Sequence, residues 1–152
     1  MAQRQVAVVL PSIRSAHNTG SFFRTADAAG VSKIYLAGYT APPPHPHVLK
    51  VSLGAEESVP WEYCADPIDL ATKLCDEGYQ SVGVELTDYS VDFRKANYSD
   101  KVALWFGNEI HGLSPELQQL MDMMVKIPMH GLKESLNVSV AGGVMIYHVT
   151  HY

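Results

Sequence analysis

The stretch IPMHGLKESLNVSVAGGV, residues 127–144, decides how this chain folds. It begins at the end of an apolar strand, is broken by Pro128 and Gly131, and continues as a run of small apolar residues with helical spacing. Ser135 or Asn137 can cap that helix by accepting its free N–H groups. A strand that ends in a turn and a helix N-terminus leaves backbone N–H groups pointing outward, an arrangement that suits a polar small molecule.

Two adjacent glycines lie inside this predicted helix, Gly142 and Gly143. Each costs about 1 kcal/mol relative to alanine in a helix interior. We therefore expect the backbone of this helix to approach another helix closely.

The length and composition indicate one globular domain covering residues 1–152, without a substantial extension at either end. Apolar residues make up 47% of the chain and charged residues 18%, which are the values of an ordinary soluble protein. No apolar run is long enough to span a bilayer, and the first residues lack the apolar segment of a secretion signal. We expect a cytoplasmic protein in which Cys64 and Cys75 are free thiols.

The charges are distributed unevenly along the chain. Residues 1–50 carry five Lys/Arg and one acid, whereas residues 51–100 carry three Lys/Arg and eleven acids. Although the net charge is −5, a phosphate-binding face is therefore expected on the N-terminal third.

Apolar, β-branched runs alternate with segments of helical spacing, which predicts an α/β fold with a mainly parallel sheet. The predicted strands are residues 5–10, 33–37, 59–65, 81–86, 101–106 and 123–127. The predicted helices are residues 19–29, 49–57 and 67–77, one that starts at Ser114-Pro115-Glu116, and the C-terminal one. Residues 87–100 are expected to form a polar connection.

Two further clusters contain polar residues that could carry chemistry. The first is NTGSFFRTA at residues 18–26, where Asn18 could cap a helix and Arg24 could either pair with Asp27 or contact a phosphate. The second is FGNE at residues 106–109, directly after a buried strand. Open α/β sheets bind ligands at such strand ends, although an ordinary tight turn with a solvated Glu109 would also explain the pattern.

Together these clusters resemble the TrmH lineage of SPOUT methyltransferases, which methylate the ribose 2′-hydroxyl of RNA with S-adenosylmethionine. The matching motifs are N-x-G-x-x-x-R-T-A at 18–26, F-G-N-E at 106–109 and I-P-M…S-L-N-V-S at 127–139, in the family's order. The resemblance covers essentially the whole chain. It implies a C-terminal deep trefoil knot, and a homodimer whose active site takes residues from both subunits.

The resemblance also implies roles for individual residues. Arg24 matches the family's catalytic arginine, and four polar residues match those that position it and the target ribose: Asn18, Glu109, Ser135 and Asn137. The expected contacts of S-adenosylmethionine are Leu86 (or its neighbour Glu85), Gly107, Ile127, Met129 and Leu136. The expected substrate is RNA, with tRNA ahead of rRNA, and the short chain is more similar to the compact wobble-ribose enzymes than to the D-loop guanosine enzymes.

Two other functions stay open at this point. One is a knotted RNA-binding protein that has lost catalysis, and the other is a methyltransferase that acts on a base, as in the guanine-N1 branch. The seven histidines do not form a zinc pattern, so no metal is expected. Because His111 and His130 stand beside motif residues, we expect them to contact cofactor or RNA.

Overall fold

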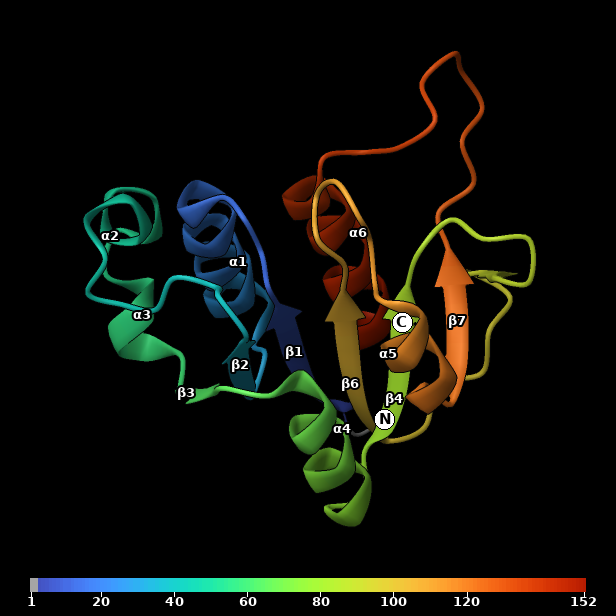
Figure 1. The fold of residues 1–152 in the computed structure, drawn as a ribbon, viewed down its shortest axis with the longest axis horizontal. Coiled ribbons are helices and arrows are strands. Elements are labelled where there is room, and N and C mark those ends of the chain that lie inside the picture. Colours follow the sequence, from blue (N-terminus) through green and yellow to red (C-terminus); the bar gives the residue numbers. More distant parts are fainter. Residues whose placement is uncertain (1–2) are drawn as a thin grey trace.

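A seven-stranded sheet runs through the computed structural model, which describes residues 3–152 (Figure 1). Its strand order is β3-β2-β1-β6-β4-β7-β5, and all neighbouring strands are parallel. The predicted α/β class with a mainly parallel sheet is confirmed. The strands are β1 (Gln5–Pro11), β2 (Lys33–Ala37), β3 (Trp61–Cys64), β4 (Gln80–Val84), β5 (Val91–Asp92), β6 (Lys101–Phe106) and β7 (Met123–Lys126).

Helices cover both faces of the sheet. The two long helices α1 (Ala16–Ala29) and α6 (Val138–His151) pack on one face, and the short helices α2 (Pro46–Ser52) and α3 (Ala55–Ser58) join the same core. The helices α4 (Pro67–Asp76) and α5 (Pro115–Leu120) pack on the other face. Because side chains alternate along a strand, β1 supplies Val6, Val8 and Leu10 to the first core and Ala7 and Val9 to the second.

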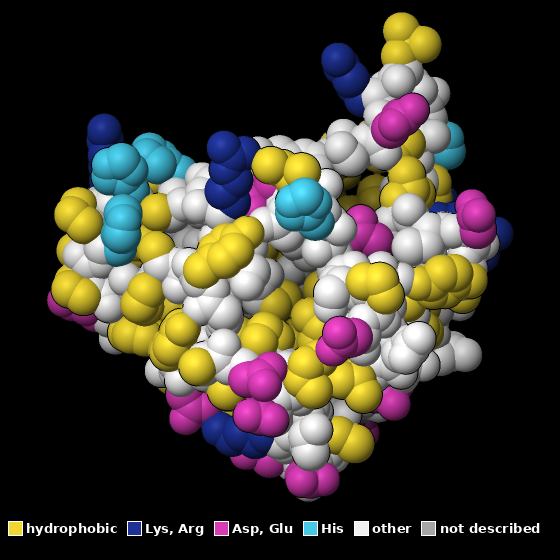
Figure 2. Space-filling model, viewed as in Figure 1, with side chains coloured by type: hydrophobic (Ala, Val, Ile, Leu, Met, Phe, Trp, Pro, Cys, Tyr) yellow, Lys and Arg dark blue, Asp and Glu magenta, His cyan; other side chains and the backbone are white. Residues whose placement is uncertain are grey.

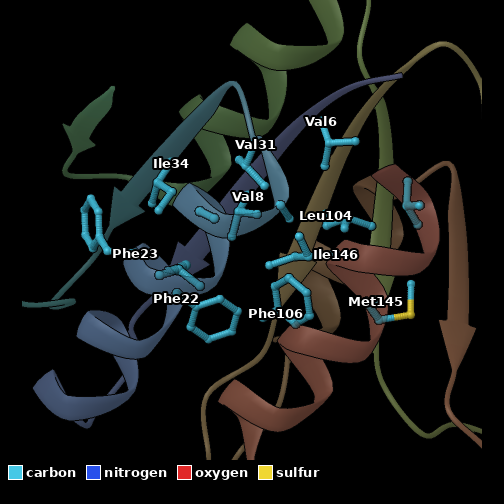
Figure 3. Close-up of a cluster of buried hydrophobic side chains, with 14 of the residues drawn as sticks. Val6, Val8, Phe22, Phe23, Val31, Ile34, Leu104, Phe106, Met145 and Ile146 are labelled. Atoms are coloured by element: carbon cyan, nitrogen blue, oxygen red, sulfur yellow. The ribbon is translucent and has the colours of Figure 1, made fainter. Parts of the chain in front are cut away.

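The largest core lies between α1, α6 and the middle of the sheet (Figure 3). Phe22 on α1 meets Phe106 at the end of β6, with ring centroids 5.0 Å apart. A Cβ atom placed on Gly142 would come within 2.3 Å of the Phe22 ring, whereas one on Gly143 would meet nothing within 4 Å. The predicted close approach is therefore confirmed for Gly142, but Gly143 has no such neighbour among residues 3–152.

Several boundaries differ from the sequence prediction. Helix α1 begins at Ala16 because Ser15 is its cap, and the Ser15 side chain accepts a hydrogen bond from the Asn18 N–H at 3.2 Å. The predicted helix at 49–57 is two short helices, because Leu53 and Gly54 adopt positive φ values of 50° and 93°. The predicted connection at 87–100 contains β5, whose two residues pair with β7.

Both ends of α6 are held by side chains. Asn137 caps the start of the helix by accepting the Ser139 N–H at 2.9 Å, so Ser135, the other predicted cap, does not serve as one. At the far end, Arg4 donates from Nη1 to the carbonyl oxygens of Val149 (3.3 Å) and Tyr152 (3.1 Å). None of the helices in residues 3–152 is long and apolar enough to cross a membrane.

Candidate active site

A cleft of about 360 Å³ opens at the carboxyl ends of β4, β6 and β7 and reaches the N-terminus of α6. This volume is within the usual range for a small-molecule site. Its walls are Val84, Glu85, Leu86, Phe106, Gly107, Asn108, Glu109, Ile127, Met129, Glu134, Ser135, Leu136, Asn137, Val138 and Ala141. All five residues that were predicted to contact a cofactor are among them, together with three of the five that were predicted to be catalytic.

The charge of these walls limits the kind of ligand that can bind. Three glutamates line the cleft, and its lining contains no Lys, Arg or His side chain. Much of the remaining wall is apolar, from Leu86, Ile127 and Leu136 among others. A ligand that carries phosphates would meet uncompensated negative charge here, whereas a cationic ligand with a flat apolar part is complementary.

The floor of the cleft is built on Glu85, at the end of β4. The Glu85 carboxylate accepts the Leu113 N–H at 3.0 Å, which holds the β6–α5 loop over it. A Cβ atom on Gly107 would lie 2.6 Å from the Gly112 backbone, and one on Gly112 would lie 2.5 Å from the Glu85 carboxylate. Both glycines are therefore required by close packing within the loop, and Gly107 also lines the cleft.

The loop from β7 to α6 forms the opposite wall and projects beyond the sheet (Figure 1). Among the described residues, no hydrogen bond is found for the backbone groups of residues 128–136. Backbone N–H and C=O groups that become buried almost always gain a hydrogen-bond partner. The groups of this wall have no partner in the loop itself, so they are available to a ligand that covers them. Together with the acidic lining, this loop fits S-adenosylmethionine, which combines an adenine ring with a sulfonium and an ammonium group.

Glu109 joins the cleft to the start of α1. Its carboxylate accepts the backbone N–H groups of Arg14 and Ser15, both at 2.8 Å, and the Asn18 side-chain amide at 2.9 Å. Partial burial raises the pKa of Glu109, but these three hydrogen bonds outweigh that effect and hold the pKa below its ordinary value. Asn18 and Glu109 are thus in direct contact, and Glu109, although exposed, is held by three hydrogen bonds rather than being free in an ordinary turn.

We expect Glu109→Gln to lower the free energy of unfolding by about 1 kcal/mol or less at pH 7, because a neutral amide accepts fewer of these bonds and the site is exposed. The pKa of Glu109 is lower in the folded protein than its ordinary value of 4.5. Its contribution to the free energy of unfolding is therefore fully present above pH 4.5 and is lost as the pH falls through the folded-state pKa. Urea midpoints of both proteins at pH 7 and pH 3 measure this. Glu57→Gln is the control, and an undiminished difference at pH 3 would contradict the interpretation.

Asn108 is part of the F-G-N-E motif, but no role was predicted for it from the sequence. Its side-chain oxygen accepts the N–H groups of Ile110 and His111 at 2.8 and 2.9 Å. Its amide nitrogen donates to the Ser12 carbonyl oxygen at 2.9 Å and to the Tyr39 hydroxyl at 2.6 Å. Asn108 therefore ties together the loops that follow β1, β2 and β6. Glu134, Val138 and Ala141 also line the cleft without having been predicted.

Arg24 is not part of the cleft wall of its own chain. It is exposed on α1, and the ion pair with Asp27, one of the two alternatives considered for it, does not form among residues 3–152. His111 and His130 are exposed and lie outside the cleft lining as well. The structure thus brings Asn18, Glu109, Ser135 and Asn137 to one side of the molecule and leaves Arg24 apart from the cleft.

Lys, Arg and His side chains gather along the upper edge of the molecule, where the strands end (Figures 1 and 2). The rings of His17 and His45 each lie against that of His47, with centroids 5.2 and 5.5 Å apart. Within the described part of the chain, no group of three His, Cys, Asp or Glu side chains is arranged to hold a metal ion. This edge is suited to a large anion instead.

A family model for the SpoU rRNA methylase family matches residues 5–147. The chain belongs to this family. It is 34% identical over 146 residues to the tRNA (guanosine(18)-2′-O)-methyltransferase of Aquifex aeolicus, a match that covers 95% of this chain and 68% of that enzyme. The predicted TrmH/SpoU family, a family of RNA methyltransferases, is therefore confirmed.

Solved structures of SpoU methylases agree with this assignment. An AdoMet-bound rRNA methyltransferase from Sinorhizobium meliloti superposes with a TM-score of 0.90 and 33% identity, over 97% of this chain and 56% of that one. A structure described as giving insights into 2-OH methylation of C/U34 on tRNA has a TM-score of 0.85 at 24% identity. At that identity it shows the fold alone, but the match covers 94% of its chain. The SpoU methyltransferase AviRb from Streptomyces viridochromogenes, 28% identical with a TM-score of 0.86, was also solved in complex with AdoMet, so S-adenosylmethionine is the cofactor predicted for this family.

Proposed function

We propose that this SpoU methylase transfers a methyl group from S-adenosylmethionine to the ribose 2′-hydroxyl of a nucleotide in RNA. The proposed substrate is tRNA, with rRNA as the second candidate. One observation carries the proposal: the cleft combines three glutamates, apolar walls and unpaired backbone groups, and its lining has no cationic side chain. These features match a cationic nucleoside and disfavour a nucleotide.

The walls suggest how the cofactor would be held. The side chains of Leu86, Ile127 and Leu136 would enclose the adenine, and the backbones of Gly107 and Met129 would meet its polar groups. Glu134 is placed to balance positive charge. When bound, S-adenosylmethionine supplies an electrophilic methyl group; the residues of the chain have to align the acceptor hydroxyl with it, and alignment provides much of the acceleration in such a displacement.

Arg24 is the proposed catalytic residue, and its chemistry limits what it can do. A guanidinium carries no free lone pair that can accept a proton at physiological pH, so it cannot remove the proton of the hydroxyl. We propose that it binds the adjacent phosphate and stabilises negative charge that develops on the 2′-oxygen, while phosphate or water takes the proton. Ser135 and Asn137 are proposed to contact the target ribose, and Glu109 and Asn18 to fix the start of α1 beside it.

A homodimer would supply the missing arginine. The outer face of α6 exposes an apolar stripe, with Val140 at 52%, Val144 at 39% and Tyr147 at 42% exposure. Gly143 lies on this helix with open space around its Cα, which permits close approach of a second backbone. We propose that two copies pack through α6 and that the partner subunit's Arg24 completes each cleft.

Val144→Glu is expected to convert the dimer to a monomer, because it buries a charge in the proposed interface. Leu120→Glu on α5 is the matched control, since Leu120 is exposed to 45% on the opposite face of the sheet. Sedimentation velocity reports the mass of each protein. Equal masses for the two variants would rule out the α6 interface.

The C-terminal segment is also proposed to form the trefoil knot that the family resemblance implies. The chain leaves β7 near one edge of the sheet, and α6 then returns to pack against α1 and β1 in its middle (Figure 1). This return path is compatible with threading through the β6–α5 loop region. An experimental chain trace that can be pulled straight from its two ends would exclude the knot.

One set of experiments separates the proposed function from its two alternatives. Calorimetry with S-adenosylmethionine tests for the cofactor, and lack of binding would favour a catalytically inactive RNA-binding protein. Incubation with labelled cofactor and tRNA that lacks the host's own modification tests for transfer. Nuclease P1 digestion and mass spectrometry then locate the methyl group on the ribose, as we expect, or on a base, as a guanine-N1 type enzyme would leave it.

Cofactor binding should also protect the projecting loop from proteolysis. Leu132 is fully exposed, and the backbone around Lys133 is without hydrogen bonds among the described residues, so trypsin should cut after Lys133 in the free protein. Saturating S-adenosylmethionine is expected to slow this cut about 10-fold. Cleavage after Lys95 serves as the control in the same digest, and equal slowing of both cuts would argue against a local effect.

A further inference from the structure

Tyr39 is an exposed aromatic residue that is nevertheless held in place at two points. It follows β2 at the edge of the sheet where the strands end, and 62% of its surface is exposed. Its hydroxyl accepts a hydrogen bond from the Asn108 side chain at 2.6 Å, and its backbone N–H donates to the Ser12 hydroxyl at 3.4 Å. An exposed tyrosine ring usually turns freely, so this anchoring presents one fixed ring face to solvent.

The anchor places this ring at the rim of the cleft. Asn108 lines the cleft, and the next residue, Glu109, holds the start of α1 through Arg14, Ser15 and Asn18. Asn108 also bonds the carbonyl oxygen of Ser12, whose φ of 52° is unusual for a residue other than glycine. Three loops therefore converge on Asn108. Tyr39 is the large aromatic side chain that Asn108 holds at the solvent-exposed edge of this cluster.

The acidic cleft determines where an RNA strand can run. Its glutamates repel phosphates, so the sugar–phosphate backbone must pass outside it, along the edge where basic and histidine side chains gather (Figure 2). Residues 1–50, which include Tyr39, carry five Lys/Arg and one acid. A ribose whose 2′-hydroxyl points into the cleft leaves its base, and the neighbouring bases, at this rim. Unstacked bases of RNA bind by stacking on aromatic side chains.

We propose that Tyr39 is a stacking platform for a nucleobase of the RNA substrate, at or next to the methylated nucleotide. This inference rests on the proposed function, because it takes the cleft as the site that the ribose enters. The ring, rather than the hydroxyl, makes the contact with RNA. The hydroxyl bond to Asn108 fixes the angle of the ring.

Three variants separate stacking from a structural role. Tyr39→Ala removes the ring, Tyr39→Phe keeps the ring without the bond to Asn108, and Tyr89→Ala is the matched control. Tyr89 is also exposed to 62% and its hydroxyl also bonds a side-chain amide, that of Gln118. For each protein, fluorescence anisotropy measures the Kd of labelled, unmodified tRNA, calorimetry measures the Kd of S-adenosylmethionine, and tritium transfer measures kcat and KM.

We expect Tyr39→Ala to raise the Kd and the KM for tRNA about 10-fold. This is the effect that alanine substitution of a base-stacking aromatic residue has in proteins that bind single-stranded nucleic acid. Tyr39→Phe should stay within about threefold of the wild type, and Tyr89→Ala and the cofactor Kd should be unchanged. A Tyr39→Ala protein with a wild-type Kd for tRNA would overturn the proposal. So would a Tyr39→Phe protein that is as impaired as Tyr39→Ala, since the hydroxyl bond alone would then matter.

The two proposals can fail independently. If the wild type binds tRNA in a manner that depends on the Tyr39 ring but transfers no methyl group, the stacking platform stands and the methyltransferase function falls. If the wild type methylates tRNA and Tyr39→Ala does so with the same KM, the function stands and the platform falls. Absence of any tRNA binding by the wild type would overturn both.

Discussion

Arg24→Lys is expected to reduce kcat for RNA methylation about 100-fold, with no change in the Kd for S-adenosylmethionine. Arg24 is exposed on α1 and lies outside the cleft lining of its own chain, so the substitution should not disturb the cofactor. Lysine keeps the charge but lacks the planar fork that can hold a phosphate and a developing oxyanion together. Single-turnover transfer of tritium to unmodified tRNA measures the rate.

Arg14→Lys is the matched control, because Arg14 is also exposed and its contact with Glu109 is made by the backbone N–H. It should keep kcat within about threefold of the wild type. Near-normal methylation by Arg24→Lys would show that the guanidinium is unnecessary.

A further check is to co-express the Arg24→Lys chain with a Leu136→Arg chain, in which a cation enters the cleft. If each site combines two subunits, a mixed dimer has one site with an intact cleft and an intact Arg24. Random pairing should then restore about a quarter of the wild-type activity.

Gly142→Val is expected to lower the free energy of unfolding by about 3 kcal/mol, the upper range for overpacking a filled core. Its Cβ would come within 2.3 Å of the Phe22 ring, which is fully buried against Phe106 and has no room to move. The loss corresponds to a fall in Tm of about 6–12 °C for a protein of this size. Thermal and urea unfolding at one protomer concentration measure it.

A pair of alanine variants isolates the cause. Gly142→Ala and Gly143→Ala both gain about 1 kcal/mol of helix propensity, but only the first adds an atom against Phe22. Because Gly143→Ala adds no atom against the core of its own chain, it should be more stable than Gly142→Ala by about 1–3 kcal/mol. Equal urea midpoints for the two variants would mean that the core between α1 and α6 can relax, contrary to the packing described.

The parts of the fold that were predicted correctly depend on short-range patterns. Lys33–Ala37 and Lys101–Phe106 were predicted to the residue because each is an apolar run with a charged residue at one end and glycine after the other. The start of α1 was misplaced because Ser15 and Asn18 are both good caps, and only the three-dimensional contact with Glu109 shows that Asn18 has another partner. The two-residue strand β5 has no pattern of its own and exists because β7 lies beside it.

Some residues of the candidate site could likewise be predicted from short-range patterns, and others could not. The cofactor residues come from strand ends, and parallel strands bring their carboxyl ends together, so motif positions such as Gly107 and Ile127 could be placed from the sequence. The role of Asn108 could not, because its partners lie 69 to 96 residues away and are chosen by tertiary structure. Arg24 lies outside the cleft of its own chain, so its predicted catalytic role depends on the proposed second copy of the chain, and no pattern within one chain shows how two copies would pack.

Arg4 gives the molecule a property that neither end of the chain would have alone. Its guanidinium, directly before strand β1, donates hydrogen bonds to the carbonyl oxygens of Val149 in the last turn of α6 and of Tyr152, the residue that follows this helix. Residues that are 145 and 148 positions apart in the sequence are thus parts of one cooperative unit, and the start of β1 reaches its native contacts only once α6 has been synthesised and packed. Loss of the contacts that Val149 and Tyr152 make with Arg4 should therefore weaken the attachment of α6 to the sheet.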